Sequence, residues 1–482
     1  MSFKVGKKRP NFLFILIDDM GWKDVGFMGG RYYETPNIDK LACEGMVFTS
    51  AYANAPNCAP TRACFLTGQH SSRHGVITVG SSARGASSDR RLIPVTNDTI
   101  LNTEHVTFAE VLKSAGYVSA SMGKWHMGDP PTHGPCEQGF NVNVGGHAAG
   151  GPYTGDEYFA PYDNPWLLPE GPTGEYLTDR LSDEAISFIE TNKDKPFFLY
   201  LTHYAVHTPL EAKQDLEDYY NTPEKVADRT TLPKHDNATY GAMIHSVDEG
   251  IENIMKKLEE LKLEEDTVVI FFCDNGGHGD YTDMHPLRGA KGMFYEGGIR
   301  EPMIVRWKNH VKPGTTCDVP VIGTDFFPTF LEQAGVKKPT GKILDGLSLV
   351  PLLKGESRLS REAIFWHFPA YLESYLPDPE ARDPKFRSRP VSVIRKGNWK
   401  LLQFFEEWLL DGGWGTIETN NAIELYDLEA DLGEQDNRAH SSSPNYNPVK
   451  RDELLNDLIA WQNSVGAPNS LSDMPANPGY VP

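Results

Sequence analysis

The sequence predicts an α/β protein with one large domain followed by a smaller one. Three continuous apolar runs predict strands, at Phe12–Ile17, Pro196–Thr202 and Thr267–Cys273. The first and third runs do not alternate with polar residues, which is typical of strands that are covered on both faces. Helical patterns lie between the runs, and the longest spans Asn237–Leu261. A chain of 482 residues, 39% of them hydrophobic, has room for both units.

Composition and charge exclude several classes of protein. The formal net charge of −20 argues against a nucleic-acid partner and favours a soluble acidic protein. The six cysteines contain no CxxC pair, so they describe neither a disulfide framework nor a zinc module. No apolar run approaches the ~18 residues of a membrane-spanning helix, so we expect no membrane segment.

The N-terminus imitates a signal peptide without matching one. Basic residues 7–9 precede the run Phe12–Ile17, but this run is shorter than the apolar region of a signal peptide and stops at Asp18. The sequence therefore leaves two alternatives, a cytoplasmic protein or one whose leader has been removed.

Two adjacent carboxylates, Asp18 and Asp19, follow directly after the first strand. Open α/β sheets bind their ligands at the carboxyl ends of their strands. Buried carboxylates at such a place need a cation between them, and the plain alternative is a solvated turn. Next along the chain, a helix is predicted over Thr35–Ala42 and a strand over Met46–Tyr52.

A short helix is predicted to start at Pro60, with Cys58 just before its first turn, and to end at Gly68. Pro60 suits the first turn of a helix, and the unpaired N–H groups of that turn favour anions. Arg62 lies four residues after Cys58, so we expect both side chains on one helical face. The order strand, cysteine, helix is typical of a nucleophile. The alternatives are an ordinary buried cysteine or a geometrically awkward disulfide with Cys64.

Two more segments place titratable side chains just after a predicted strand. Lys124 and His126 follow the strand Tyr117–Met122, and His207 lies in the loop after the run that ends at Thr202. Taken alone, each is more often a surface lysine or a hydrogen-bonded histidine. The irregular stretch 130–175 between them is expected to line a binding site or to pack on the surface.

Asp274 and Asn275 end the third apolar run in the same way as the two aspartates end the first. Three carboxylates and one amide that converge from two strands form the hard oxygen set that suits Ca²⁺ or Mg²⁺. Zinc would require more histidine or cysteine. Lys291 follows in a glycine-rich loop before the predicted strand Met303–Trp307.

The domain boundary is predicted after residue 357, which gives a first domain over 1–357 and a smaller one over 358–482. A helix over Arg451–Gln462 is expected to close the chain. Between the boundary and this helix, β-rich pieces predict a small antiparallel sheet, at Ala363–His367, Val391–Ile394 and Trp399–Phe404.

Together these residues carry a family resemblance. The segments concerned are Asp18–Asp19, Cys58–Arg62 with Thr67–Gly68, Gly123–His126, His207–Pro209, Asp274–Asn275, Gly289–Lys291, Glu296–Arg300 and Leu425–Leu428. They resemble the motifs of the type I, formylglycine-dependent sulfatases of the alkaline phosphatase-like superfamily, over essentially the whole chain. The resemblance implies a large central mixed, mostly parallel sheet flanked by helices. It also implies a smaller C-terminal α+β subdomain with an antiparallel sheet, which completes the substrate pocket.

The resemblance further implies the chemistry of the site. A maturation enzyme would convert Cys58 to formylglycine, and the implied catalytic residues are Cys58, Arg62, Lys124, His126, His207 and Lys291. One Ca²⁺, with Mg²⁺ as the second choice, would bind Asp18, Asp19, Cys58, Asp274 and Asn275. The substrate would be a sulfated saccharide, with galactose or N-acetylgalactosamine 4-sulfate as the specific expectation, and the location would be periplasmic or secreted.

Two alternatives share part of this pattern. A formylglycine-dependent phosphonate monoester hydrolase or phosphodiesterase would have the same nucleophile and metal ligands. A catalytically silent carbohydrate-binding relative would keep Cys58 as a thiol. For the sulfatase, the stretch 130–175 and the C-terminal domain, including His367, are expected to shape the pocket for the leaving group.

Overall fold

A mixed sheet forms the centre of the molecule. The computed structural model describes residues 9–152, 158–167, 169–227, 234–374 and 380–481. Within these ranges, nine strands form one sheet in the order β4-β3-β5-β1-β6-β7-β2-β8, with β9 paired to β2. The strands are β1 (Asn11–Ile17), β2 (Met46–Tyr52), β3 (Val118–Gly123), β4 (Val142–Val144), β5 (Phe197–Thr202), β6 (Thr267–Cys273), β7 (Arg300–Arg306), β8 (Thr315–Cys317) and β9 (Val321–Ile322). Strands β3, β5, β1 and β6 are parallel and β7 is antiparallel to both its neighbours, so the predicted fold class is confirmed.

Strand β1 shows why the sequence has continuous apolar runs. All seven of its residues are buried. Successive side chains point to opposite faces of a sheet, and here Leu13 and Ile15 pack on one face while Phe12 and Phe14 pack on the other. Because both faces are covered, the six positions Phe12–Ile17 are all apolar, and the buried Asn11 at the start of the strand donates a hydrogen bond to the Thr267 hydroxyl at 3.3 Å.

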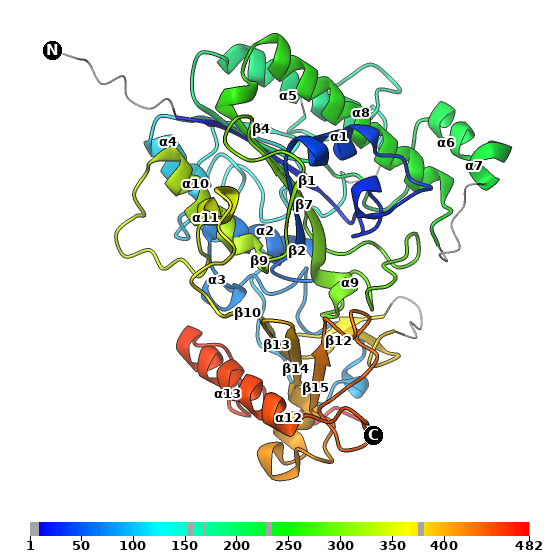
Figure 1. The fold of residues 1–482 in the computed structure, drawn as a ribbon, viewed down its shortest axis with the longest axis vertical. Helices are drawn as coiled ribbons and strands as arrows, with labels where there is room; N and C mark the ends of the chain where they lie inside the picture. The colour runs from blue at the N-terminus through cyan, green and yellow to red at the C-terminus, as the bar shows by residue number, and fades with distance from the viewer. Residues whose placement is uncertain (1–8, 153–157, 168, 228–233, 375–379, 482) are drawn as a thin grey trace.

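Helices cover both faces of the sheet (Figure 1). Helices α1, α5 and α8 pack with one hydrophobic cluster, and α2, α4, α10 and α11 pack with the cluster on the other face. The helices are α1 (Pro36–Glu44), α2 (Cys58–Thr67), α3 (Ser71–His74), α4 (Phe108–Ser114), α5 (Leu177–Asn192), α6 (Gln214–Tyr220), α7 (Pro223–Ala227), α8 (Ala238–Glu260), α9 (Glu296–Ile299), α10 (Phe326–Ala334), α11 (Val350–Leu353), α12 (Phe405–Leu410) and α13 (Pro448–Val465). Among the residues described, no helix combines the length and the apolar character needed to span a bilayer.

A separate antiparallel sheet lies below the central sheet in Figure 1. It has the order β10-β13-β14-β15, and α13 packs against it. A two-stranded sheet, β11 with β12, accompanies it. The strands are β10 (Ala363–Phe368), β11 (Leu372–Glu373), β12 (Phe386–Ser388), β13 (Val391–Lys396), β14 (Trp399–Phe404) and β15 (Ile423–Asp427). The expected antiparallel sheet is confirmed, and the boundary after residue 357 stays a prediction.

Some elements extend beyond their predicted bounds. Strand β7 begins at Arg300 rather than Met303, because Arg300 and Glu301 pair with the end of β2 and are buried there. Helix α13 begins at Pro448, and the side chain of Asn447 caps it by accepting a hydrogen bond from the Lys450 backbone N–H. Strand pairing and helix capping therefore start both elements earlier in the chain than the hydrophobic pattern predicts.

Candidate active site

The carboxyl ends of the parallel strands converge at one edge of the central sheet. Asp18 and Asp19 follow β1, Lys124 follows β3, and Asp274 and Asn275 follow β6. Because β3, β5, β1 and β6 are consecutive parallel neighbours, their ends share one edge. Side chains that are up to 256 positions apart in the chain therefore meet there.

Cys58 is the first residue of α2 and follows Asn57, whose backbone is extended with φ −151°. The helix thus starts two residues before the position expected from Pro60, and it ends at Gly68 in the left-handed conformation, as predicted. Cys58 is 2% exposed. Burial, and then the charge of Asp18, raise the pKa of its thiol to about 12. An unmodified Cys58 is therefore a protonated thiol and a poor nucleophile.

Cys64 has a structural place in the same helix. Both Cys58 and Cys64 are free thiols, so the disulfide alternative is excluded. The Cys64 Sγ lies 3.4 Å from Nε2 of His74, and both residues are buried. Cys64 is therefore part of the packing between α2 and α3.

Arg62 is fully buried at the centre of the site. Its Nε and Nη2 donate to Oδ2 of Asp274 at 3.0 and 2.8 Å. Its Nη1 donates to the Lys124 carbonyl at 2.9 Å and to the Thr202 hydroxyl. Although burial opposes its charge, Asp274 raises the pKa of Arg62, so the guanidinium is a permanent cation with one fixed orientation.

Three carboxylates form a cluster suited to a metal ion. One oxygen from each of Asp18, Asp19 and Asp274 lies within 4.8 Å of the others, and all three residues are buried. Asn275 Nδ2 donates to Oδ1 of Asp19 at 2.7 Å, so the Oδ1 atom of Asn275 takes no part in this hydrogen bond. Oδ1 of Asp18 and Oδ1 of Asn275 are buried and accept no hydrogen bond from any described residue. Buried oxygens without donors fit a hard cation such as Ca²⁺.

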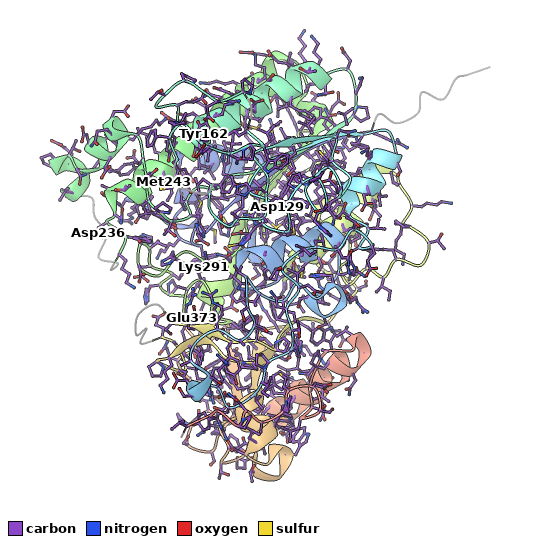
Figure 2. All side chains as sticks on the ribbon, turned by 180° about the vertical axis from the view of Figure 1, so that it is seen from behind. Asp129, Tyr162, Asp236, Met243, Lys291 and Glu373 are labelled. Carbon is purple, nitrogen blue, oxygen red and sulfur yellow. The ribbon has the colours of Figure 1, made fainter. Side chains whose placement is uncertain are left out.

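Two lysines balance the charge of this cluster. Lys124 Nζ pairs with Oδ2 of Asp18, and Lys291 Nζ pairs with Oδ2 of Asp19 at 2.6 Å. Burial alone would raise the pKa of Asp19, but Lys291, His207 and Lys124 together lower it. Asp19 is therefore ionised at neutral pH, as a metal ligand must be. Lys291 keeps 10% of its side chain exposed, where the upper and lower parts of the molecule meet (Figure 2).

Two histidines flank the cluster in different surroundings. His126 has a positive φ of 64° and a buried Nδ1 without a partner among the described residues. His207 keeps 19% of its side chain exposed, and its Nε2 lies 3.7 Å from Oδ2 of Asp19. Burial and nearby lysines lower the pKa of both, that of His207 to about 3. Both rings are therefore neutral in this structure.

The stretch 130–175, which contains β4, reaches the candidate site at Gly150, and its residues 153–157 and 168 lie outside the described residues. A Cβ atom at Gly150 would lie 2.7 Å from Cε1 of His126, so the backbone of this stretch packs directly on the ring. Glycine is required there by the close approach rather than by its own φ. The stretch therefore covers one side of the candidate site.

The structure also corrects and extends the set of residues. Thr202, at the end of β5, accepts a hydrogen bond from Arg62 and helps to orient it, and no local pattern indicates this role because hydroxyls are common at strand ends. His367, expected near the pocket, is buried with its Nδ1 2.6 Å from the Ser392 hydroxyl and its ring against Phe405. That histidine belongs to the packing of the small sheet.

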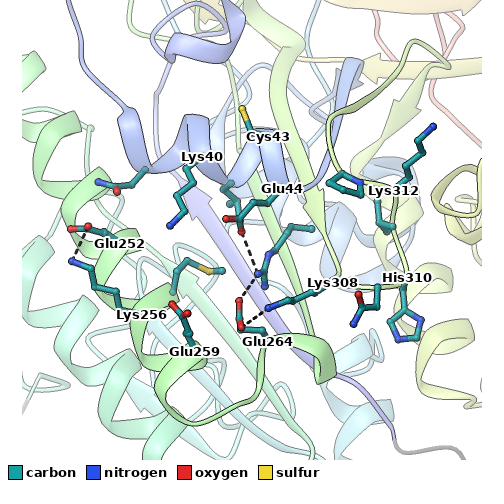
Figure 3. A pocket seen from close by; sticks show the side chains of 17 residues that line it. Lys40, Cys43, Glu44, Glu252, Lys256, Glu259, Glu264, Lys308, His310 and Lys312 are labelled. Atoms are coloured by element: carbon teal, nitrogen blue, oxygen red, sulfur yellow. Dashed lines mark hydrogen bonds and ion pairs between the residues drawn. The ribbon is translucent and has the colours of Figure 1, made fainter.

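A cavity of about 700 Å³ lies at the opposite edge of the central sheet (Figure 3). Its wall includes Arg306, at the end of β7, and residues of α1 and α8. The Arg306 guanidinium pairs with Glu44 and Glu264, and Lys256 pairs with Glu252. Since these charges compensate one another and the described residues form no metal-type cluster here, size alone does not make this cavity the active site, although the free thiol of Cys43 lies in its wall.

This chain is similar to known proteins over most of its length. A family model described as "Sulfatase" matches residues 10–336. A model described as "N-sulphoglucosamine sulphohydrolase, C-terminal" matches residues 289–463. A protein named "Sulfatase" from Formosa agariphila is 31% identical, over 97% of this chain and 91% of its own. N-acetylgalactosamine-6-sulfatase from Mus musculus is 34% identical, over 72% of this chain and 67% of its own.

Solved structures are also similar to this chain. The crystal structure of Ps i-CgsB superposes with a TM-score of 0.74 at 29% identity and covers 96% of this chain and 94% of its own. The same protein has been solved in complex with k-i-k-neocarrahexaose, with a TM-score of 0.74 at 28% identity to this chain. These similarities extend over both sheets of the molecule.

Proposed function

This chain belongs to the sulfatase family and hydrolyses sulfate esters, and on that premise we propose that it removes O-sulfate groups from a carbohydrate. Two relatives support a saccharide substrate, one through its name and one through the oligosaccharide bound in its structure. The name of the mouse relative refers to position 6, whereas 4-sulfate was the expectation from sequence, so both positions are candidates. A periplasmic or secreted location stays a prediction.

The observation that carries the proposal is the position of Cys58 among buried opposite charges. Arg62, Lys124 and Lys291 supply three cations beside it, which suits a sulfate monoester that must be neutralised before a nucleophile approaches. Burial raises the pKa of the thiol, which disfavours a thiolate nucleophile and supports a modified residue at this position. Formylglycine formed at Cys58 by a maturation enzyme would supply a hydrated aldehyde, one hydroxyl of which can attack sulfur.

Calcium is the metal that we propose for the carboxylate cluster. Asp18, Asp19, Asp274 and Asn275 would hold it together with residue 58, and the ion would supply positive charge at a sulfate oxygen. The two oxygens without donors, on Asp18 and Asn275, support this assignment. The choice of Ca²⁺ over Mg²⁺ rests on the irregular set of protein oxygens.

The remaining residues would bind the sulfate group and move protons. Arg62, fixed by Asp274, would stabilise negative charge on the side chain at position 58, and Lys124 and Lys291 would bind sulfate oxygens. Burial and then the charges of Lys291 and Lys124 lower the pKa of His207. An anionic ester between the lysines would offset the second of these causes and so favour a ring that carries the proton needed by the departing sugar oxygen. His126, with its unpartnered Nδ1, would take a proton from residue 58.

The test is a screen of defined sulfated mono- and disaccharides for release of inorganic sulfate, with protein coexpressed with a maturation enzyme. Mass spectrometry of the peptide that holds Cys58 establishes conversion, because formylglycine is about 18 Da lighter than cysteine, whereas thiol oxidation adds mass. Fully converted protein that cleaves aryl phosphonates but no sulfated sugar would overturn the proposal in favour of a phosphonate monoester hydrolase. Converted protein that binds sulfated sugars without turnover would favour the silent relative.

A further inference from the structure

The backbone that carries Lys291 is held from three directions. The Lys291 N–H donates to the Gly277 carbonyl at 3.0 Å, in the loop that follows the metal-cluster residues. The Gly292 N–H donates to the Pro56 carbonyl at 2.7 Å, two residues before Cys58. These two bonds tie the lysine to the metal cluster and to the nucleophile helix.

The third contact comes from β12, in the C-terminal part of the chain. Nη1 of Arg387 donates to the Lys291 carbonyl at 3.3 Å, and the Ser388 hydroxyl donates to the Gly292 carbonyl at 2.8 Å. The consecutive carbonyls of Lys291 and Gly292 thus accept hydrogen bonds from two consecutive side chains of β12. Side chains from beyond the large sheet therefore fix the backbone from which the Lys291 side chain extends into the site.

The contact between the two segments is also sterically close. Gly292 has a φ of +95°, and a Cβ atom there would lie 2.9 Å from Cδ2 of Leu372 and 3.1 Å from Cδ of Arg387. Both the backbone conformation and the proximity of the two-stranded sheet thus exclude other residues at this position. The segment cannot move away from Arg387 without opening a packed contact.

Arg387 is itself anchored in its own sheet. Its Nε donates to the Glu373 carbonyl at 3.0 Å, on the partner strand β11. The Glu373 carboxylate in turn pairs with Arg84 at 2.7 Å, from the loop after α3. Figure 2 shows Glu373 adjacent to Lys291. The Arg387 guanidinium therefore links the Glu373 carbonyl of β11 to the Lys291 carbonyl.

We propose that Arg387 and Ser388 are positioning residues for Lys291 in sulfate ester hydrolysis. This inference rests on the proposed role of Lys291 in binding sulfate. A lysine side chain has four rotatable bonds, so the location of Nζ depends on where the backbone begins. Misplacement of a binding group by about 1 Å can cost about 10²-fold in rate. Neither residue touches the cluster around Cys58 in the contacts described, and both act through the carbonyls of residues 291 and 292.

The experiment is a double-mutant cycle on turnover of an aryl sulfate by fully converted protein. We expect R387M to lower kcat about tenfold with little change in KM, and R387K to restore part of the loss. S388A, which removes a single hydroxyl, should give a smaller loss in the same direction. In a K291Q background, R387M should change the residual rate less than twofold, because residues acting through one group are not additive.

The matched control is R389M. Arg389 lies two residues further on, and it pairs with Glu406 and with Glu407 at 2.7 Å instead of with the lysine segment. R389M is expected to lower the melting temperature while kcat stays unchanged. Equal fold losses from R387M in the wild-type and K291Q backgrounds would overturn the proposal, as would an unchanged kcat in both R387M and S388A. If the converted wild-type protein cleaves no sulfate ester at all, the proposed function fails instead, which separates the two outcomes.

Discussion

Two clusters of buried charge can be compared in this molecule. The metal cluster consists of Asp18, Asp19, Asp274 and Asn275 with Arg62, Lys124 and Lys291. The joint cluster consists of Tyr52, Glu296, Arg300, Arg395, Lys400 and Glu434, and it lies where β2 and α9 of the large sheet meet β13, β14 and the chain after β15. Both contain buried carboxylates and cations, yet they differ in how their oxygens are used.

Each carboxylate oxygen of the joint cluster has a donor close by. Oε1 of Glu296 lies 3.0 Å from Lys400 Nζ, and Oε2 accepts from the Tyr52 hydroxyl at 2.6 Å. Oε1 of Glu434 makes no hydrogen bond of good geometry but lies 2.9 Å from Lys400 Nζ, and Oε2 accepts from the Glu296 N–H at 2.6 Å. In the metal cluster, by contrast, the nearest cation to the unbonded Oδ1 of Asp18 is Arg62 at 4.0 Å, and Oδ1 of Asn275 accepts no hydrogen bond from any described residue.

The difference separates structural from functional burial of charge. A cluster whose oxygens are all matched holds two parts of the protein together and offers nothing to a ligand. A cluster with unmatched buried oxygens is stable only if a further cation supplies the missing contacts. The predictions below test this distinction.

The largest effect is expected from C58A. This variant removes the precursor of the proposed nucleophile, so sulfate release should fall by about 10⁴-fold or more while the fold is kept. The matched control is C64A, a buried cysteine of the same helix that faces His74, which should keep most of the activity. Sulfate release and circular dichroism of both variants check this. Comparable activity in C58A and wild type would refute the role of Cys58.

The next effect concerns the unmatched oxygens of the metal cluster. Chelation of Ca²⁺ should abolish turnover and lower the melting temperature, because an ion that binds only the folded state stabilises it by about 2.7 kcal/mol at 100 times its Kd. In D274N, which weakens the cluster and leaves Arg62 without its partner, added Ca²⁺ should no longer raise the melting temperature. Differential scanning fluorimetry with and without Ca²⁺ measures both. A calcium-dependent shift of equal size in D274N would contradict this reading.

A substitution in the joint cluster should lower the free energy of unfolding and leave kcat unchanged. K400M leaves Glu296 and Glu434 buried without their shared cation, and removing one partner of a buried pair costs about 3–5 kcal/mol. Urea denaturation should show this loss, while kcat per folded molecule stays near the wild-type value. The control K396M removes a partly exposed lysine of β13, in the same sheet as Lys400, that pairs with Asp457 of α13, and it should cost less than about 1 kcal/mol. Equal losses of unfolding free energy in K400M and K396M would show that the joint cluster stabilises the protein no more than a surface ion pair does.

The smallest effect is a pH dependence of stability. Burial, and the neighbouring charge of Glu296, raise the pKa of Glu434 from its ordinary value of 4.5 to about 7, although Lys400 opposes this. Between these two values the folded state binds a proton that the unfolded state has lost, so this group makes stability fall as the pH rises from 4.5 to 7. In E434Q the melting temperature should vary less over this window. A steeper decline in E434Q than in wild type would contradict the assignment.

Much of the fold was predictable because its signals are local. The run that forms β1 was expected over Phe12–Ile17 and is observed over Asn11–Ile17. The helix that starts at Cys58 was expected from Pro60 and Gly68, and only its first turn was misplaced. Residues at strand ends were expected to converge because parallel strands share an edge, and they do. The roles of these residues stay proposals.

What could not be predicted depends on contacts between distant segments. Arg62 was expected beside Cys58, yet nothing near it in the chain indicates that Asp274, 212 residues later, fixes its orientation. The joint cluster draws on Tyr52 and Lys400, neither of which stands out in its own segment, and on Glu296, which the sequence marks only as part of a family motif. The hold of Arg387 on Lys291 spans 96 residues and acts on a carbonyl, which every residue type possesses.

The sequence by itself determined the strands, helix α2 and the types of side chain that meet at the strand ends, because periodicity, capping and residue type act over a few neighbouring positions. Only the tertiary structure decided which oxygens stay unmatched and which cations are already taken, because these depend on how segments hundreds of residues apart pack together. In this protein that distinction separates the metal cluster from the joint cluster, although the two are built from the same kinds of side chain.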